Sequence, residues 1–158
     1  MKTSDHPELH ELVESRLQRT AQRYTAGRRA VVEALMEIGN PATIEDLGRC
    51  CPDLPLSSLY RHLVALQAAN VVTRVASNGS RYGRFEIEEH ITGHHHHLVC
   101  SACGRVTAVV PSNTLKEFMN QHLEDMASSE GFLVRSHRID IYGVCAECQK
   151  APPRVQHR

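Results

Sequence analysis

The sequence predicts an α+β protein, with helices and a β-hairpin in its first half and strands around one long helix in its second. Three observations predict this. Apolar residues recur at helical spacing between residues 9 and 69. Residues 71–87 then change to short β-branched runs around Asn78-Gly79, a hairpin turn signal. Two Cys-x-x-Cys motifs follow, each next to an expected strand.

Four amphipathic helices are expected before residue 70. The first covers residues 9–19, and Thr25, Thr43 and Ser57 are expected to begin the next three. A hydroxyl at an N-cap accepts a hydrogen bond from a free backbone N–H, which is why these residues mark helix starts. In the fourth helix the apolar stripe consists of Leu59, Leu63, Leu66 and Ala69. Its other positions include Ser58, Tyr60, Arg61 and His62.

Helices followed by a hairpin are the order of a winged helix-turn-helix, whose last helix enters the major groove of DNA. The free N–H groups and the hydroxyls of Ser57 and Ser58 can reach phosphate. Tyr60 can contact a thymine methyl, and Arg61 can reach a base edge or the backbone. Residues 16–29 also carry five arginines and no acid, although a solvated helix face explains that pattern about equally well.

In the second half we expect strands at residues 98–100 and 105–110, a helix over 112–129 and a final strand within 132–144. The expected domains are a winged-helix domain, a metal-binding domain and a disordered tail, covering residues 1–87 (with 1–20 as an N-terminal helix), 88–150 and 151–158.

The location of the protein is expected to be cytoplasmic, with no membrane association. No apolar run approaches the roughly 20 residues that cross a membrane. Residues 1–10 are polar and do not resemble a signal peptide. Six cysteines in such a compartment are expected to bind metal or to be buried rather than to form disulfides. Cys50 and Cys51, at a helix end, are expected to be buried thiols.

The two Cys-x-x-Cys motifs predict a structural zinc site. Together they supply four thiolates, which suit one tetrahedral Zn²⁺ ion and leave no open coordination position for catalysis. A redox-active Cys-x-x-Cys is the alternative, but such a motif opens a helix, whereas both motifs here follow strands. The four residues are Cys100, Cys103, Cys145 and Cys148.

Four consecutive histidines, His94 to His97, precede the first of these motifs. In an extended segment alternate side chains point to opposite faces, so His95 and His97 would seed one metal site and His94 and His96 another. A purification tag and a solvated surface run are the alternatives, but this run is internal and leads into a strand. Further candidate ligands are Glu86, Glu88, Glu89, His90, Glu117, His122 and His137. Imidazole and carboxylate ligands suit Zn²⁺, Fe²⁺, Mn²⁺, Co²⁺ or Ni²⁺.

Several of these pieces, in this order, resemble the ferric uptake regulator (Fur) family of metalloregulators. The resemblance covers about residues 20–148. Its matching segments are Tyr24-Thr25-x-x-Arg28-Arg29, Ser57-Ser58-Leu59-Tyr60-Arg61, Phe85-Glu86, His94 to Gly104, and His137 to Cys148. The histidine run leading into Leu-Val-Cys-x-x-Cys-Gly is the most specific of them. The resemblance implies a winged helix-turn-helix followed by an α/β dimerisation domain, with a regulatory metal that controls DNA binding.

The resemblance also implies roles for individual residues. By this resemblance the four cysteines would bind the structural zinc, and Glu86, His95 and His97 would form the regulatory site. A further site falls on His94, His96, His137 and an acid of the helix at 112–129. DNA contact falls on Tyr60 and Arg61, with support from the basic stretch around Arg28.

Three departures from the family pattern affect these roles. A histidine that the family often supplies from its DNA-binding domain is missing from the segment at 40–43, and His90 is the candidate replacement. The helix at 112–129 carries an insertion, so its ligand is ambiguous between Glu117 and His122. No cysteine matches the regulatory thiolate of many zinc-uptake members, which makes zinc sensing plausible but not favoured.

The expected function is a metal-dependent repressor, not an enzyme, that binds palindromic double-stranded operator DNA as a homodimer. Its cofactors are structural Zn²⁺ and a second divalent ion: Zn²⁺, Fe²⁺, Mn²⁺ or Ni²⁺. One alternative is a metallohydrolase that uses the histidines, but the sequence has no His-Glu-x-x-His and no His-x-Glu paired with Pro-Cys-x-x-Cys. The other is a zinc-buffering or partner-binding module without DNA affinity. Peroxide sensing, the operator and the regulated genes stay open.

Overall fold

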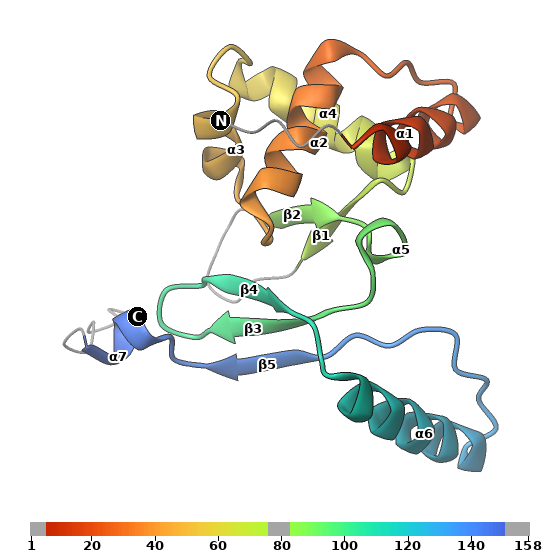
Figure 1. Cartoon of the computed structure of the whole chain (residues 1–158). Coiled ribbons are helices and arrows are strands. Elements are labelled where there is room, and N and C mark those ends of the chain that lie inside the picture. The colour runs from red at the N-terminus through yellow and green to blue at the C-terminus, as the bar shows by residue number, and fades with distance from the viewer. Residues whose placement is uncertain (1–5, 76–82, 151–158) are drawn as a thin grey trace. The chain divides into compact units, whose positions relative to one another are not determined.

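A computed structural model of the chain describes residues 6–75 and 83–150 (Figure 1). They divide into two compact units, one ending at Gly93 and the other beginning at His94. The sequence suggested a division after residue 87. The short helix α5 (Glu89–Thr92) extends the first unit, because Ile91 packs against its core.

The described part of the first unit contains four longer helices: α1 (Pro7–Arg19), α2 (Ala26–Ile38), α3 (Ile44–Cys50) and α4 (Leu56–Ala68). Their apolar stripes meet in one core, as the helical spacing predicted. Residues at its centre are at most 1% exposed: Val13, Leu17, Val31, Val32, Leu47, Leu59, Leu63 and Leu66. Burial of these side chains is the main term that stabilises the unit.

Two of the three predicted helix caps are present. Thr25 accepts a hydrogen bond from the backbone N–H of Arg28. Thr43 and Asp46 form a capping box, with bonds of 2.8 and 3.1 Å to each other's backbone N–H. The prediction for Ser57 was wrong. Helix α4 begins at Leu56, two residues earlier than a Ser57 cap predicts. Its cap position is Pro55, whose φ of −56° already suits a helix start, so Ser57 lies within the first turn.

The wing consists of β1 (Val72–Val75) and β2 (Arg84–Ile87), which pair antiparallel. The turn predicted at residues 77–80 lies outside the described residues. Phe85 exchanges two backbone hydrogen bonds of 2.8 Å with Ala42, in the loop between α2 and α3. This bridge fixes the wing to the helices.

The second unit contains a three-stranded sheet in the order β4-β3-β5. Strand β3 (His96–Cys100) pairs antiparallel with β4 (Val106–Val109) and parallel with β5 (Asp140–Gly143). Helix α6 (Asn113–Ser129) connects β4 to β5, and α7 (Ala146–Lys150) follows β5. The predicted final strand is therefore shortened to four residues, and α7 was not predicted.

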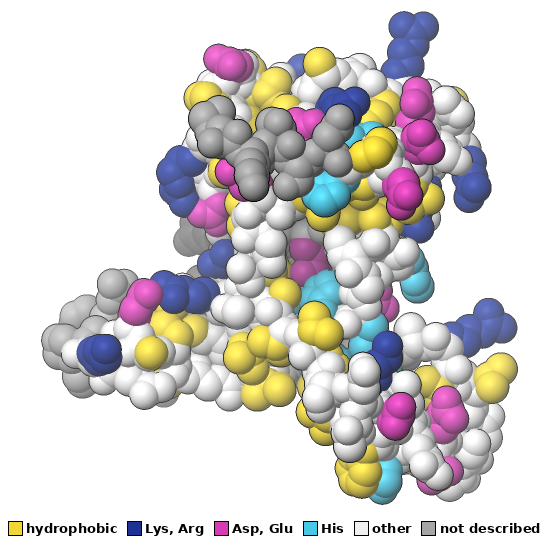
Figure 2. Space-filling model, viewed as in Figure 1, with side chains coloured by type: hydrophobic (Ala, Val, Ile, Leu, Met, Phe, Trp, Pro, Cys, Tyr) yellow, Lys and Arg dark blue, Asp and Glu magenta, His cyan; other side chains and the backbone are white. Residues whose placement is uncertain are grey.

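Helix α6 has apolar residues but no buried ones. Large apolar side chains are exposed on it, beside it and on β5, and Figure 2 shows several such yellow patches. They are Val110, Leu115, Phe118, Met126, Phe132, Leu133, Ile141, Tyr142 and Val144. Exposed apolar surface of this extent marks an interaction site. Within the described residues, no helix is both long and apolar enough to cross a membrane.

Candidate metal centres

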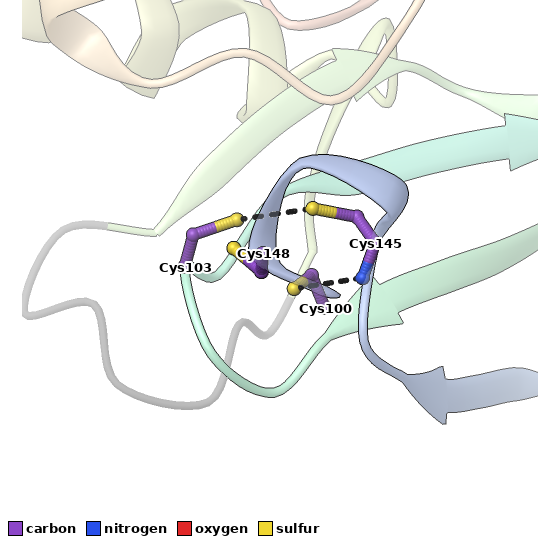
Figure 3. A group of neighbouring side chains, drawn as sticks. All are labelled: Cys100, Cys103, Cys145 and Cys148. Atoms are coloured by element: carbon purple, nitrogen blue, oxygen red, sulfur yellow. Dashed lines mark hydrogen bonds between the residues drawn. The ribbon is translucent and has the colours of Figure 1, made fainter. Parts of the chain in front are cut away.

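Four cysteine side chains converge at one end of the sheet (Figure 3). Cys100 ends β3 and Cys103 lies in the turn after it, while Cys145 and Cys148 come from the junction of β5 with α7. Their four sulfur atoms all lie within 4.8 Å of one another. The parallel pairing of β3 with β5 brings the motifs together, because both strands end at the same edge.

This cluster fits a tetrahedral zinc ion. Zn–S bonds of about 2.3 Å place the sulfur atoms of a tetrahedron about 3.8 Å apart, and the Sγ atoms of Cys103 and Cys145 are 3.8 Å apart. The backbone N–H of Cys145 donates to the sulfur of Cys100 and, with that of Cys103, lowers the pKa of this thiol to about 6. Hydrogen bonds with Cys145 and Cys103 raise the pKa of Cys148 to about 12. A bound cation would favour the thiolate form of all four sulfur atoms.

A second cluster joins His94 and His96 to His137, which precedes β5. One ligand nitrogen from each of the three lies within 4.8 Å of the others. The Nε2 atoms of His94 and His137 are 3.2 Å apart, and the rings of His94 and His96 meet edge to face. His96 is 5% exposed, and neither of its ring nitrogens has a hydrogen-bond partner in the described structure.

The unpartnered imidazole of His96 is the observation that fits a metal ion here. A buried polar group without a partner is destabilising, and coordination would satisfy one of its nitrogens. Burial, and then the neighbouring His94 and His137, lower the pKa of His96, so the neutral form that binds metals is favoured. The three imidazoles would hold the ion, with the remaining positions left to other donors.

The predicted fourth ligand is not in this cluster. Glu117 and His122 are both exposed on α6. The ring of His122 stacks on Phe118 of the same helix, and its Nδ1 bonds with the backbone carbonyl of Phe118 at 2.8 Å. These contacts hold the ring of His122 against its own helix. The structure therefore does not support Glu117 or His122 as a ligand of this cluster.

The other two histidines of the run lie together, as the alternation predicted. The rings of His95 and His97 meet edge to face, with centroids 5.1 Å apart. His97 is 1% exposed, and its Nδ1 lies 3.3 Å from Oδ1 of Asp140 on β5. The pair offers two imidazole nitrogens to one ion.

The remaining regulatory candidates belong to the first unit. Glu86 lies on β2 opposite Thr73 and is 8% exposed, which is unusual for a carboxylate. His90 lies exposed on α5, at a cleft of about 480 Å³ that Arg16 and Arg19 also line. Two guanidinium groups make that cleft less favourable for a cation.

The residues predicted to contact DNA lie on and beside α4. Tyr60 is 39% exposed, and Arg61 donates to the hydroxyl of Ser58 at 3.1 Å. Ser57 is exposed in the first turn. Arg28 donates to Gln22 and to the carbonyl of Arg23, so in this structure it braces the segment before α2.

The model of the ferric uptake regulator family matches residues 19–142, most of the chain. The chain belongs to this family. Among curated relatives, the ferric uptake regulation protein of Legionella pneumophila is 35% identical over 120 residues, covering 76% of this chain and 74% of that protein. The peroxide operon regulator of Bacillus subtilis is 28% identical over 151 residues, covering 90% of this chain and 94% of that protein.

Solved structures agree on the fold of this Fur family member. The ferric uptake regulator of Vibrio cholerae matches with a TM-score of 0.67 and 25% identity, covering 84% of this chain and 98% of that one. The expected α+β class, with a helical first half and a small second domain, is therefore confirmed. The predicted membership of the family is confirmed as well.

Two features of the Fur family chain were not found from the sequence. The prediction of two buried thiols was wrong for Cys50, which is exposed. It was right for Cys51, which is buried with its thiol 3.6 Å from the carbonyl of Ala30. Helical periodicity places residue 50 at the end of α3 but does not say which of two adjacent residues faces inward. Asp140 was also missed, because its contact with His97 depends on the parallel register of β3 and β5.

Replacing His96 with leucine tests the three-histidine cluster. In protein that keeps its cysteine-bound zinc but holds no other metal, at pH 8, the free energy of unfolding should stay equal or rise, because an unpartnered polar group is removed. Adding metal at 100 times its Kd should stabilise the wild-type protein by about 2.7 kcal/mol, and the variant by less. Chemical denaturation with and without metal measures both, with His122→Leu as the exposed control.

The His96→Leu variant should also differ from the wild type in how its stability depends on pH. Since the pKa of His96 is lowered in the folded state, the unfolded chain takes up the proton more readily. The stability that the neutral form of His96 allows is complete above about pH 6.5. It is lost as the pH falls below that value toward the lower folded-state pKa. With only the cysteine-bound zinc retained, His96→Leu should lose less stability than the wild type over that range. An equal loss in both proteins would exclude His96 as the source.

Proposed function

We propose that the protein is a metal-dependent repressor that binds operator DNA as a homodimer in the cytoplasm. The observation that carries this proposal is strand β3, which bears His96, His97 and Cys100. It therefore supplies a residue to the three-histidine cluster, to the pair of His95 and His97, and to the four-cysteine cluster. Membership of the ferric uptake regulator family supports the regulatory role. The cysteine cluster would hold structural zinc.

The regulatory site is proposed to consist of His95 and His97 together with Glu86. Glu86 is the favoured carboxylate because it is buried in its own strand pair. His90 is kept as a further candidate, although its cationic surroundings count against it. Nitrogen and oxygen ligands of this kind suit Fe²⁺, Mn²⁺, Zn²⁺ or Ni²⁺. His94, His96 and His137 form the third proposed site.

Control of DNA binding would arise by linkage. Ligands from two parts of the chain bind an ion more tightly when those parts are correctly arranged, so occupancy favours that arrangement. A coupling of about 1–3 kcal/mol would change operator affinity about 5- to 150-fold. The Vibrio cholerae relative, whose DNA-binding domains undergo a structural rearrangement, makes such a mechanism reasonable for this chain.

The test is a titration of metal into the protein after mild chelation that leaves the cysteine-bound zinc in place. Binding to a fragment of its own promoter is measured by fluorescence anisotropy with Zn²⁺, Fe²⁺, Mn²⁺ and Ni²⁺. At least one ion should strengthen binding within the range given above. Metal binding with no DNA affinity under any condition would instead favour a zinc-buffering module. Turnover of ester, peptide or nucleoside substrates would favour a hydrolase.

Replacing Tyr60 with alanine should weaken specific operator binding, by up to about 150-fold, while zinc content stays unchanged. Tyr60 is 39% exposed on α4 and is not one of the buried core residues, so the change is expected to remove a base contact without unfolding the unit. One good base contact contributes about 1–3 kcal/mol, or up to about 150-fold. Val64→Ala, at the next exposed turn of α4, is the matched control. Unchanged operator affinity in Tyr60→Ala would remove Tyr60 from recognition.

A further inference from the structure

The side chain of His97 is held by an acid on the neighbouring strand. In the parallel register of β3 and β5, His97 lies opposite Asp140, and its backbone N–H donates to the carbonyl of Ile139 at 3.2 Å. The Nδ1 atom of His97 lies 3.3 Å from Oδ1 of Asp140. The side chain of His97 is 2% exposed and that of Asp140 is 22% exposed. The contact is therefore shielded from most of the solvent.

This contact restricts which ring nitrogen of His97 carries the proton. An ionised carboxylate can only accept hydrogen bonds, so Nδ1 must be the donor. In a neutral imidazole the other nitrogen, Nε2, then carries the lone pair. A carboxylate behind a histidine fixes both the tautomer and the orientation of the ring, and makes it a stronger metal ligand.

We infer that Asp140 is a positioning residue that holds His97 as its Nδ1–H tautomer and presents Nε2 to the regulatory metal ion. This inference rests on the proposed function, which uses His95 and His97 as ligands. Asp140 is assigned to orient His97 rather than to bind the ion, because one of its carboxylate oxygens lies 3.3 Å from Nδ1. The role differs from that of the three-histidine cluster, in which His96 has no hydrogen-bond partner in the described structure.

A purely structural role for Asp140 is the competing explanation, because the same contact helps to join β5 to β3. The two roles differ in what they predict for the ring of His97. A structural role predicts a change in stability alone. A positioning role predicts a change in the protonated nitrogen, even in folded protein with its cysteine-bound zinc retained.

The first experiment is a ¹⁵N-histidine NMR measurement on the full chain, with the regulatory sites stripped and the cysteine-bound zinc retained. Loss of one signal in His97→Gln assigns His97. The wild-type protein should show the Nδ1–H tautomer, and Asp140→Ala should shift the ring toward the Nε2–H form. Asp125→Ala, which removes an exposed acid from α6, is the matched control and should leave the tautomer unchanged.

The second experiment measures metal affinity by competition with a chelator of known Kd, using Co²⁺ and Mn²⁺ as probes. Loss of such a supporting carboxylate costs about 10- to 100-fold in affinity, so Asp140→Ala should bind the probes more weakly by that factor. Asp140→Asn keeps an oxygen acceptor but loses the charge. Its affinity for the probe ions should therefore lie between that of Asp140→Ala and that of the wild type. Zinc content should be equal in all of these proteins.

An Nε2–H tautomer in the wild-type protein, or an unchanged tautomer in Asp140→Ala, would overturn the inference. So would equal probe affinity in Asp140→Ala and Asp125→Ala. The two proposals fail differently. If the tautomer shifts as expected but His95→Ala and His97→Ala bind metal as tightly as the wild type, the regulatory site of the proposed function is refuted, and the hydrogen bond from His97 to Asp140 is upheld.

Discussion

Replacing Cys103 with serine is expected to remove tightly bound zinc and to unfold the unit that begins at His94. Among the described residues of that unit, the buried apolar side chains are only Val99, Cys100 and Val106. A sheet of three short strands with so small a core is not expected to be stable alone. Structural zinc contributes about 10–16 kcal/mol of binding free energy in small domains, more than this core can supply.

The first unit should survive this change, because it has its own core of four helices. Thermal unfolding followed by circular dichroism should therefore lose the signal of one unit and keep that of the other. Zinc content is measured in parallel by mass spectrometry. Cys50→Ser is the control, since Cys50 is exposed and lies outside the cluster. A Cys103→Ser protein with full zinc content and unchanged unfolding would contradict the structural role of the cluster.

The elements that the sequence predicted well are those with local signals. Helices α1 to α4 carry apolar stripes, and two of their starts have hydroxyl caps at Thr25 and Thr43. The four cysteines were correctly grouped because two Cys-x-x-Cys motifs have few other uses. The pairing of alternate histidines followed from the two-residue period of an extended chain.

The elements that the sequence did not predict depend on distant contacts. The alignment of His97 with Asp140 is set by the parallel register of two strands 43 residues apart. The fourth ligand of the three-histidine cluster was ambiguous because the rotation of α6 against the sheet has no local signal. The N-cap of α4 was misplaced by two residues, at Ser57, because Pro55 starts the helix through its fixed φ, without a side-chain cap.

Replacing Phe118 with glutamate is expected to dissociate the proposed homodimer and to abolish operator binding. Phe118 is 59% exposed, and Leu115 and Met126 on the same helix are also exposed. No residue of α6 is buried within one chain, so its apolar stripe needs a partner. A second copy of the chain is the partner that the family resemblance implies. Its dimer would present two recognition helices to a palindromic operator.

The size of this effect follows from the chemistry of the substitution. Truncating a central aromatic residue of an interface costs about 2–4 kcal/mol, and burying a carboxylate in its place adds to that cost. The dissociation constant of the dimer should therefore rise by at least about 30-fold, and by about a thousandfold where the cost reaches about 4 kcal/mol. Sedimentation velocity at micromolar concentration should show a monomer that retains its zinc.

A matched control separates loss of the interface from a simple change of charge. Lys116→Glu introduces the same carboxylate on an exposed position almost opposite Phe118 around the helix, and it should remain dimeric and bind the operator. If both variants dissociate, charge repulsion rather than the apolar stripe controls assembly. If Phe118→Glu stays dimeric, the apolar face of α6 has another role, and the two recognition helices must be brought together by different residues.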